Sequence, residues 1–355
     1  MGCQKPMKCP NFPQILDHLK KFIKLLLVLF LFIAVVSLYA NYLHPHFFFK
    51  KVLSSKTDTA FLNKGKDISF RSGDAVLKGK IFTNASGDRK IPLIVFCVGS
   101  GDGSTISNYA KMIDTLFLQN LPMDSIAVLC FEKRGLQASE GDWYTADFEQ
   151  RAADAKSAAD FAATLPYIDP HHIAIAGHSQ GGWITQVGLA QYPEIFSAGI
   201  SLAGPVFPVR QQLVNDYVSQ YHCAEGLNEA DAMKKAERQV SMNIFITRLF
   251  PFQPNWKQLQ VIKDFDPGIY LKKINSPILF LWGSNDPLVS PEWCKASLKK
   301  YFPGNIPGNF DTLTITGASH SFKLADLCYH GPSSQVPYAP ECKEVLLNWV
   351  RKKLL

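Results

Sequence analysis

The alternation of short apolar runs with amphipathic stretches is the feature that most constrains what this chain can fold into. The apolar runs end in glycine-rich or polar loops, and stretches of helical periodicity separate them. Strands buried on both faces have this composition, and strands that alternate with helices form a mainly parallel sheet covered on both sides. We therefore predict an α/β fold. The predicted strands are 67–71, 76–82, 93–98, 126–131, 173–176, 198–202, 278–282 and 312–316, and the predicted helices include 109–119, 146–165, 291–301 and 342–354.

The alternation stops between residues 205 and 273, where helical patterning continues without a clear strand. This stretch is rich in Gln, Lys, Glu and aromatic residues, which indicates a helical insertion that acts as a lid. Four of its aromatic residues suggest an apolar acyl pocket, or equally the core of the lid itself. They are Phe245, Phe250, Phe252 and Trp256. The predicted regions are a basic tail (1–24), a membrane helix (25–43), a linker (44–65), a core (66–206 and 274–355) and the lid (207–273).

A long uncharged segment follows the basic tail. Residues 25–43 are nearly all apolar, and 19 helical residues span about 28 Å, close to the roughly 30 Å hydrocarbon core of a bilayer. We predict an uncleaved single-pass anchor, with a cleaved signal peptide as the alternative. The candidate cleavage site Leu38-Tyr39-Ala40 lacks a small residue at its first position. A weak lysine bias predicts a cytoplasmic N-terminus and a catalytic part outside the cytoplasm.

The charge distribution argues against a nucleic-acid partner. The chain carries a formal net charge of +7, but residues 1–24 hold five Lys against one Asp. The remaining residues are therefore nearly balanced, and they contain no basic run interleaved with aromatic residues. The expected partners are a membrane and a small ester or acyl substrate.

A Gly-x-Ser-x-Gly pentapeptide, Gly177 to Gly181, lies between a predicted strand and a predicted helix. In this context a sharp turn exposes the serine hydroxyl, and bulky neighbours would clash with the crossing backbone. We predict Ser179 as a nucleophile. The alternative is a glycine-rich turn with a passive serine.

A serine nucleophile needs a histidine base that is oriented by a carboxylate, and on a parallel sheet these follow in the order Ser, Asp, His. Asp286 follows the strand 278–282 and His320 follows 312–316, so we predict these two. The alternatives are a helix cap at Asp286 and a solvated loop at His320. His178 is expected to support the turn instead. Less well placed candidates are His44, His46, His171, His172, His330, Asp264 and Asp266.

An oxyanion that develops during acyl transfer needs preorganised N–H donors. We predict the main-chain N–H of Gln180, at the start of a helix, and that of Ser100, in the loop Gly99 to Gly103 after the strand 93–98. The alternative is a plain flexible glycine loop.

The eight cysteines form no Cys-x-x-Cys pair, and histidines do not cluster, so we predict neither a metal nor another cofactor.

Cys97 and Cys130 lie in apolar runs and are expected to be buried thiols. Cys328 and Cys342 flank a loop rich in Gly, Pro and Ser, and a disulfide between them is one hypothesis if the catalytic part is exported.

These motifs together resemble the α/β-hydrolase superfamily, in particular its serine aminopeptidase-like and dienelactone-hydrolase-like bacterial members, over residues 66–355. The matching segments are 131–135, 139–143, 168–170, 177–183 and the loops of Asp286 and His320. The resemblance implies an α/β-hydrolase fold. Two departures are Val98-Gly99 in place of a frequent His-Gly pair, and Glu132 in place of a usual Asp.

The leading hypothesis is a membrane-anchored serine hydrolase that cleaves a carboxylic ester through an acyl-enzyme. The same triad also suits a peptidase, a thioesterase or an acyltransferase, and sequence does not separate them. A non-enzymatic binding protein is the remaining alternative, and the presence of all three triad residues argues against it.

Overall fold

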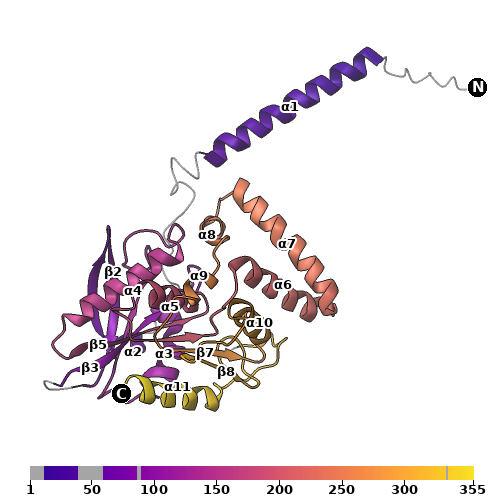
Figure 1. Cartoon of the computed structure of the whole chain (residues 1–355). Coiled ribbons are helices and arrows are strands. Elements are labelled where there is room, and N and C mark those ends of the chain that lie inside the picture. The colour runs from indigo at the N-terminus through magenta and orange to yellow at the C-terminus, as the bar shows by residue number, and fades with distance from the viewer. Residues whose placement is uncertain (1–11, 39–58, 86–88, 333–334) are drawn as a thin grey trace, which may run out of the picture.

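The computed structural model describes residues 12–38, 59–85, 89–332 and 335–355, which contain an eight-stranded sheet (Figure 1). The strand order is β1-β2-β4-β3-β5-β6-β7-β8. The strands β1 and β2 pair antiparallel, as do β2 and β4, and all other neighbours are parallel. The mainly parallel sheet is therefore confirmed. Its strands are β1 (Lys66–Ser72), β2 (Ala75–Phe82), β3 (Ile91–Cys97), β4 (Ala127–Phe131), β5 (Ile168–His178), β6 (Ala198–Leu202), β7 (Ile278–Gly283) and β8 (Phe310–Ile315).

Helices cover both faces of the sheet, and one core lies on each side. Along β7, Phe280 and Trp282 belong to one core while Leu279 and Leu281 belong to the other, as the two-residue period of a strand requires. The helices α4 (Phe148–Ala163), α5 (Gln180–Gln191), α9 (Gly268–Leu271) and α10 (Pro291–Tyr301) contribute to the first core; α2 (Thr59–Leu62), α3 (Ile106–Ile113) and α11 (Pro340–Lys353) contribute to the second.

Several elements begin or end one to five residues from the predicted bounds, and two of these differences are informative. The helix predicted over 109–119 starts at Ile106 and passes into a π-helical segment, η2 (Asp114–Leu118). The strand β5 starts at Ile168, before the predicted 173, because Ile168 pairs with Ile91 and the register shifts before the pairing resumes.

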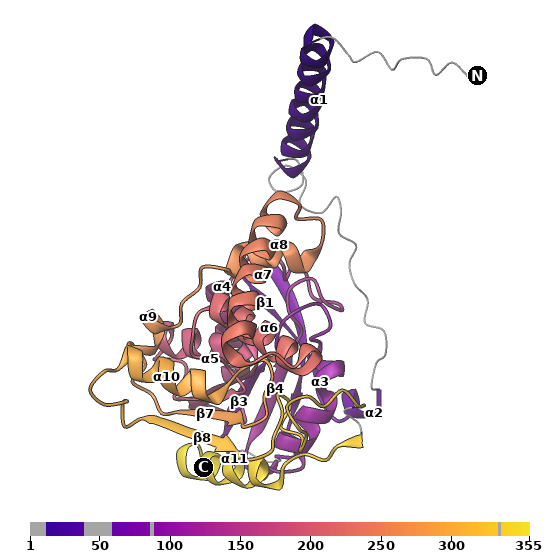
Figure 2. The same ribbon diagram turned by 90° about the vertical axis from the view of Figure 1, so that its right-hand side faces the viewer.

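Four described helices lie between β6 and β7 in the chain: α6 (Val209–Glu225), α7 (Glu229–Leu249), α8 (Pro254–Ile262) and the short α9. From here on, the lid means the first three of them, within the predicted range 207–273. The lid lies to one side of the sheet (Figure 1), and it faces the viewer in Figure 2, where α1 stands beyond α8. Gly226, with φ +67°, ends α6 in the left-handed conformation that glycine favours, and α7 turns back along α6.

The N-terminal helix α1 (Phe12–Leu38) projects away from the sheet (Figure 1). In the described part of the chain, no helix combines the length and the apolar character that crossing a membrane requires. The predicted membrane span over 25–43 is therefore not supported, and residues 39–43, with most of the predicted linker, lie outside the described residues. The uncharged part of α1, Leu25 to Leu38, is about 21 Å long, less than the hydrocarbon core.

The disulfide differs from the hypothesis drawn from the sequence. Cys328 pairs with Cys223 of α6, with 5.3 Å between their Cα atoms and 105 residues between them. Cys342 is a buried free thiol in α11, so the Cys328–Cys342 pairing is wrong. The bond joins the lid to the loop that follows His320. Cys97 and Cys130 are buried free thiols, as predicted.

Candidate active site

Ser179 occupies a tight turn between β5 and α5. Its φ is +58°, a region that non-glycine residues rarely adopt, and its main-chain N–H donates to the carbonyl of Leu202 over 2.9 Å. A Cβ at Gly177 would lie 2.0 Å from the Gly181 carbonyl oxygen, and a Cβ at Gly181 would lie 2.2 Å from that of Cys97. Both glycines are therefore required because backbone segments cross there. The strained turn presents Ser179 at the carboxyl edge of the sheet.

Asp286 and His320 come together from the loops after β7 and β8. The Nδ1 atom of His320 lies 2.8 Å from Oδ2 of Asp286, which is 3% exposed. The other carboxylate oxygen of Asp286 accepts the main-chain N–H groups of Leu288 and Val289, over 2.8 and 2.9 Å. Because a carboxylate accepts, Nδ1 of His320 carries the proton and Nε2 is free to act as a base.

His178 links this loop to the Ser179 turn. Its Nε2 lies 2.8 Å from the main-chain oxygen of His320, and its Nδ1 lies 2.9 Å from the hydroxyl of Tyr109. A carbonyl only accepts, so Nε2 donates and Nδ1 accepts from Tyr109. Burial, assisted by His320, lowers the pKa of His178 to about 3, which keeps the ring neutral. The expectation that His178 supports the turn agrees with this arrangement, whereas sequence reasoning missed Tyr109.

The predicted oxyanion residues flank Ser179. Gln180 is the first residue of α5, and Ser100 follows Gly99 in the loop after β3. A Cβ at Gly99 would lie 3.4 Å from the Ser179 Cβ and 2.5 Å from the Tyr109 hydroxyl, so only glycine permits this approach. Gly99 also donates its N–H to that hydroxyl over 3.1 Å. Ser100, Ser179 and Gln180 line one cavity.

This cavity has a volume of about 840 Å³ and extends under the lid. Most of its apolar wall comes from α5, α6 and α8, including Trp183, Leu213 and Leu259. Of the four aromatic residues suggested as an acyl pocket, Trp256 lines the cavity. Phe245 is 62% exposed, and Phe250 packs against Phe252 with ring centroids 5.7 Å apart. Asp216 of α6 also lines the cavity, and burial raises its pKa.

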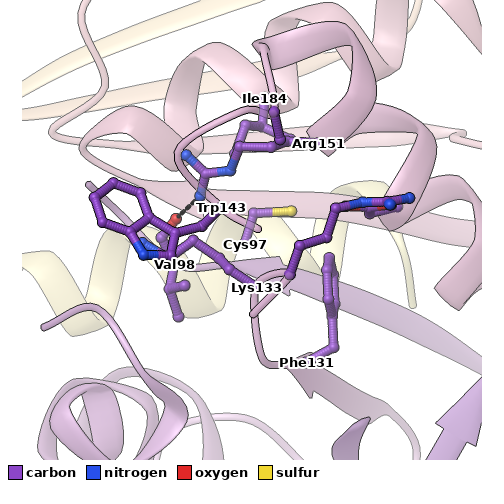
Figure 3. Close-up of a pocket in the computed structure, with 10 residues that line it drawn as sticks. Cys97, Val98, Phe131, Lys133, Trp143, Arg151 and Ile184 are labelled. Atoms are coloured by element: carbon purple, nitrogen blue, oxygen red, sulfur yellow. Dashed lines mark hydrogen bonds and ion pairs between the residues drawn. The ribbon is translucent and has the colours of Figure 1, made fainter. Parts of the chain in front are cut away.

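Two buried basic residues, Arg151 and Lys133, contact the loop Gly99 to Gly103 or the residue before it, and sequence reasoning missed both; Figure 3 shows them near Val98. Arg151 of α4 donates from Nη2 to the carbonyls of Val98 and Gly99, over 2.8 and 3.3 Å, and from Nη1 to Oε1 of Gln180 over 2.8 Å. Lys133 donates to the carbonyls of Gly99, over 3.1 Å, and Gly101. No local sequence signal pairs these residues with the loop.

The competing candidates lie elsewhere. His172 pairs with Asp169 over 2.8 Å, and Asp266 accepts from the hydroxyl of Tyr301 over 2.6 Å. Asp264 pairs with Lys263. His171 and His330 are exposed, while His44 and His46 lie outside the described residues. Within the described ranges, no group of three or more His, Cys, Asp or Glu residues could hold a metal ion.

The parallel sheet, the serine turn and the Asp286–His320 pair define a serine hydrolase of the α/β-hydrolase superfamily. Residues 131–327 match the model of the prolyl oligopeptidase family, which is more than half of the chain. The chain therefore belongs to the prolyl oligopeptidase family.

A curated relative is similar over part of its length. Dipeptidyl peptidase family member 6 from Caenorhabditis elegans is 24% identical over 178 residues, which are 49% of this chain and 21% of that protein. The chain thus spans about a fifth of the length of this relative.

Solved structures share the fold. An esterase from Pyrococcus furiosus has a TM-score of 0.58 and 15% identity, covering 86% of this chain and 97% of that one. Est1E from Butyrivibrio proteoclasticus, bound to ferulic acid, has a TM-score of 0.52 and 17% identity, covering 81% and 98%. A dipeptidyl aminopeptidase IV homologue from Bacteroides ovatus has a TM-score of 0.51 and 14% identity, covering 82% of this chain and 35% of that one.

Proposed function

We propose that this serine hydrolase cleaves carboxylic esters through an acyl-enzyme. Ser179 Oγ attacks the ester carbonyl carbon while Nε2 of His320 takes the hydroxyl proton, and Asp286 stabilises the resulting imidazolium. The main-chain N–H groups of Gln180 and Ser100 bind the oxyanion of the tetrahedral intermediate. The intermediate expels the alcohol, which takes the proton from His320. Water then attacks the acyl-enzyme by the same steps and releases the acid.

The observation that carries this proposal is the cavity of about 840 Å³ that Ser179 shares with apolar side chains of the lid. The apolar part of this wall suits the acyl or alkyl part of an ester, and polar residues that also line the cavity, among them Gln212 and Asn243, can orient the reacting carbonyl. A passive serine turn would not require His320, whose ring centroid lies 4.7 Å from that of the neighbouring His178, to be held by a buried carboxylate.

Peptide hydrolysis is the second candidate, and Asp216 is the observation that favours it. Its carboxylate lines the same cavity and accepts a hydrogen bond from Gln220 over 2.8 Å. A partly buried carboxylate in this position suits a substrate with a cationic amino group. The family match and the dipeptidyl peptidase relative agree with this alternative.

A fluorophosphonate probe tests the nucleophile, and a substrate panel separates the two candidates. The probe should label the wild-type protein at Ser179, and Ser179→Ala should lose both labelling and hydrolysis. Full activity of folded Ser179→Ala would overturn the mechanism. Acyl esters of graded length should be hydrolysed faster than aminoacyl amides; the reverse order, abolished by Asp216→Asn, would favour the peptidase.

We also propose that α1 attaches the protein to a lipid bilayer. Apolar side chains of α1 are unusually exposed, with Phe30 at 67%, Phe32 at 64% and Leu27 at 61%. Burying them in lipid would remove this apolar surface from water, and the neighbouring lysines favour anionic headgroups. The disulfide Cys223–Cys328 supports a location of the catalytic part in an oxidising compartment.

Sedimentation with vesicles containing phosphatidylserine tests this attachment. The full chain should sediment, and the double substitution Phe30→Asp and Phe32→Asp should abolish sedimentation. Ile269→Asp is the matched control, because Ile269 is also exposed, at 61%, but lies on α9. Equal sedimentation of all three proteins would contradict a role for α1.

A further inference from the structure

We infer that Arg151 is a positioning residue. It holds the two proposed oxyanion donors, the main-chain N–H groups of Ser100 and Gln180, at a fixed distance and orientation, a role that rests on the proposed function. Arg151 does not line the cavity that contains Ser179. It acts from behind the cavity wall, through two contacts with the loop after β3 and one with the start of α5.

The first contact orients the peptide between Gly99 and Ser100. No described peptide bond is cis, so the Gly99 carbonyl and the Ser100 N–H point in opposite directions. Arg151 Nη2 and Lys133 Nζ both donate to this carbonyl, over 3.3 and 3.1 Å. The Ser100 N–H therefore points away from the two basic groups. Because Ser100 lines the cavity beside Ser179, that direction suits an oxyanion donor.

The second contact holds the other donor. Arg151 Nη1 donates to Oε1 of Gln180 over 2.8 Å, and the main-chain N–H of Gln180 is the second predicted donor. The planar guanidinium presents its donors at a fixed spacing. One side chain thus sets the distance between the loop after β3 and the first residue of α5, two segments that are about 80 residues apart in sequence.

Arg151 Nη2 also donates to the carbonyl of Val98 over 2.8 Å, in the same loop, and these three contacts are its side-chain hydrogen bonds within the described part of the chain. Arg151 is 5% exposed, and the cavity that it lines with Lys133 is only about 10 Å³, at the lower limit for one water. Asp154, a nearby carboxylate on α4, is hydrogen-bonded to Arg134 and Ser72 instead. Burial lowers the pKa of Arg151 to about 10, so the guanidinium remains charged at neutral pH.

A charged group that contacts the carbonyl oxygen also polarises the peptide. Positive charge beside the Gly99 carbonyl draws electron density toward it and strengthens the Ser100 N–H as a donor. Arg151 is thus expected to stabilise the transition state more than the bound substrate. The expected signature is a fall in kcat with little change in KM.

The test compares Arg151→Met with Lys156→Met, which removes a basic side chain from the same helix, where its partner is Asp160. Arg151→Met should lower kcat by about 10- to 100-fold on the best ester of the panel, with KM within about twofold. Binding of a trifluoromethyl ketone, which forms an oxyanion on the serine, should weaken in parallel, whereas binding of the product acid should not change. Lys156→Met should retain wild-type values.

If Arg151→Met fails to fold, Gln180→Met provides a second test. Gln180 lies at the cavity wall, so its substitution disturbs the packed core less than that of the buried Arg151. It keeps the main-chain N–H, removes the acceptor of Arg151, and should lower kcat by about tenfold. In the double variant the two losses should not add, since they remove the same contact. Unchanged kcat in folded single variants, or additive losses, would overturn the role of Arg151. If the fluorophosphonate probe does not label Ser179 in the folded wild-type protein, that result would instead overturn the proposed function.

Discussion

The imidazole of His178 donates from Nε2 to the main-chain oxygen of His320 over 2.8 Å. The residue before the proposed nucleophile therefore holds the backbone of the proposed base, across 142 residues of sequence. On its other side His178 accepts from Tyr109, whose hydroxyl in turn accepts from Gly99. A chain of hydrogen bonds thus connects Gly99 in the loop after β3, the turn around Ser179 and the loop that carries His320.

Tyr109→Phe interrupts this chain. Nδ1 of His178 would lose its donor in a buried site, and the Gly99 N–H would lose its acceptor, which should lower the free energy of unfolding by about 1–3 kcal/mol. We also expect a fall in kcat of about tenfold, since three active-site segments lose a shared contact. Denaturant unfolding and steady-state kinetics measure the two effects. Wild-type values in both would contradict the role given to Tyr109.

Asp286→Asn changes the histidine tautomer without disturbing the fold. The amide oxygen of Asn can still accept from Leu288 and Val289, but its NH₂ would face Nδ1 of His320 and force Nε2 to carry the proton. We expect kcat to fall by about 10⁴-fold with the melting temperature nearly unchanged. A fall below tenfold in a folded variant would show that Asp286 does not orient the base.

Glu132→Gln should remove a pH dependence of stability. Burial raises the pKa of Glu132 to about 7 although it accepts the N–H of Ile106. Between about pH 4.5 and pH 7 the unfolded state loses this proton and the folded state keeps it, so wild-type stability falls as pH rises. The loss is at most about 3 kcal/mol. The free energy of unfolding of the variant minus that of the wild type should therefore increase from about pH 4.5 to pH 7 and stay constant above pH 7. A difference that does not change with pH would refute the raised pKa of Glu132.

Removal of the disulfide should destabilise the protein by about 2–5 kcal/mol, because Cys223–Cys328 closes a long loop in the unfolded chain. The variant carries Cys223→Ser and Cys328→Ser, and the measurement is denaturant unfolding. Dithiothreitol provides the control, since it should lower the stability of the wild type and leave the variant unchanged. Equal sensitivity of both proteins would contradict this pairing.

Gly181→Ala should destabilise the protein by more than about 3 kcal/mol, because its Cβ would lie 2.2 Å from the Cys97 carbonyl oxygen. The added Cβ is fixed to the main chain at the start of α5, and the oxygen belongs to the main chain of β3. These two segments cannot move apart without disturbing the sheet. Gly103→Ala is the matched control, since no heavy atom lies within 4 Å of its added Cβ. Thermal unfolding compares the two variants, and similar melting temperatures would refute the close crossing.

Much of the fold and the proposed triad follows from short-range patterns. The apolar runs that predict β3 to β7 form strands because each is buried on both faces, and the pentapeptide around Ser179 becomes a turn because its own glycines permit the crossing. Asp286 and His320 are predictable because parallel strands end at the same edge of the sheet. The membrane span was predicted on the same kind of local pattern, without support from the described part of α1.

The sequence by itself therefore determined the elements, their alternation and the loops that carry Ser179, Asp286 and His320, because periodicity and turn chemistry act over a few residues. The tertiary structure decided that Cys328 pairs with Cys223, and that Tyr109 and Arg151 contact residues 69 and 29 positions away. Such contacts depend on how helices pack across the sheet. Burial then gives the contacting side chains a single set of hydrogen-bond partners, which no local pattern specifies.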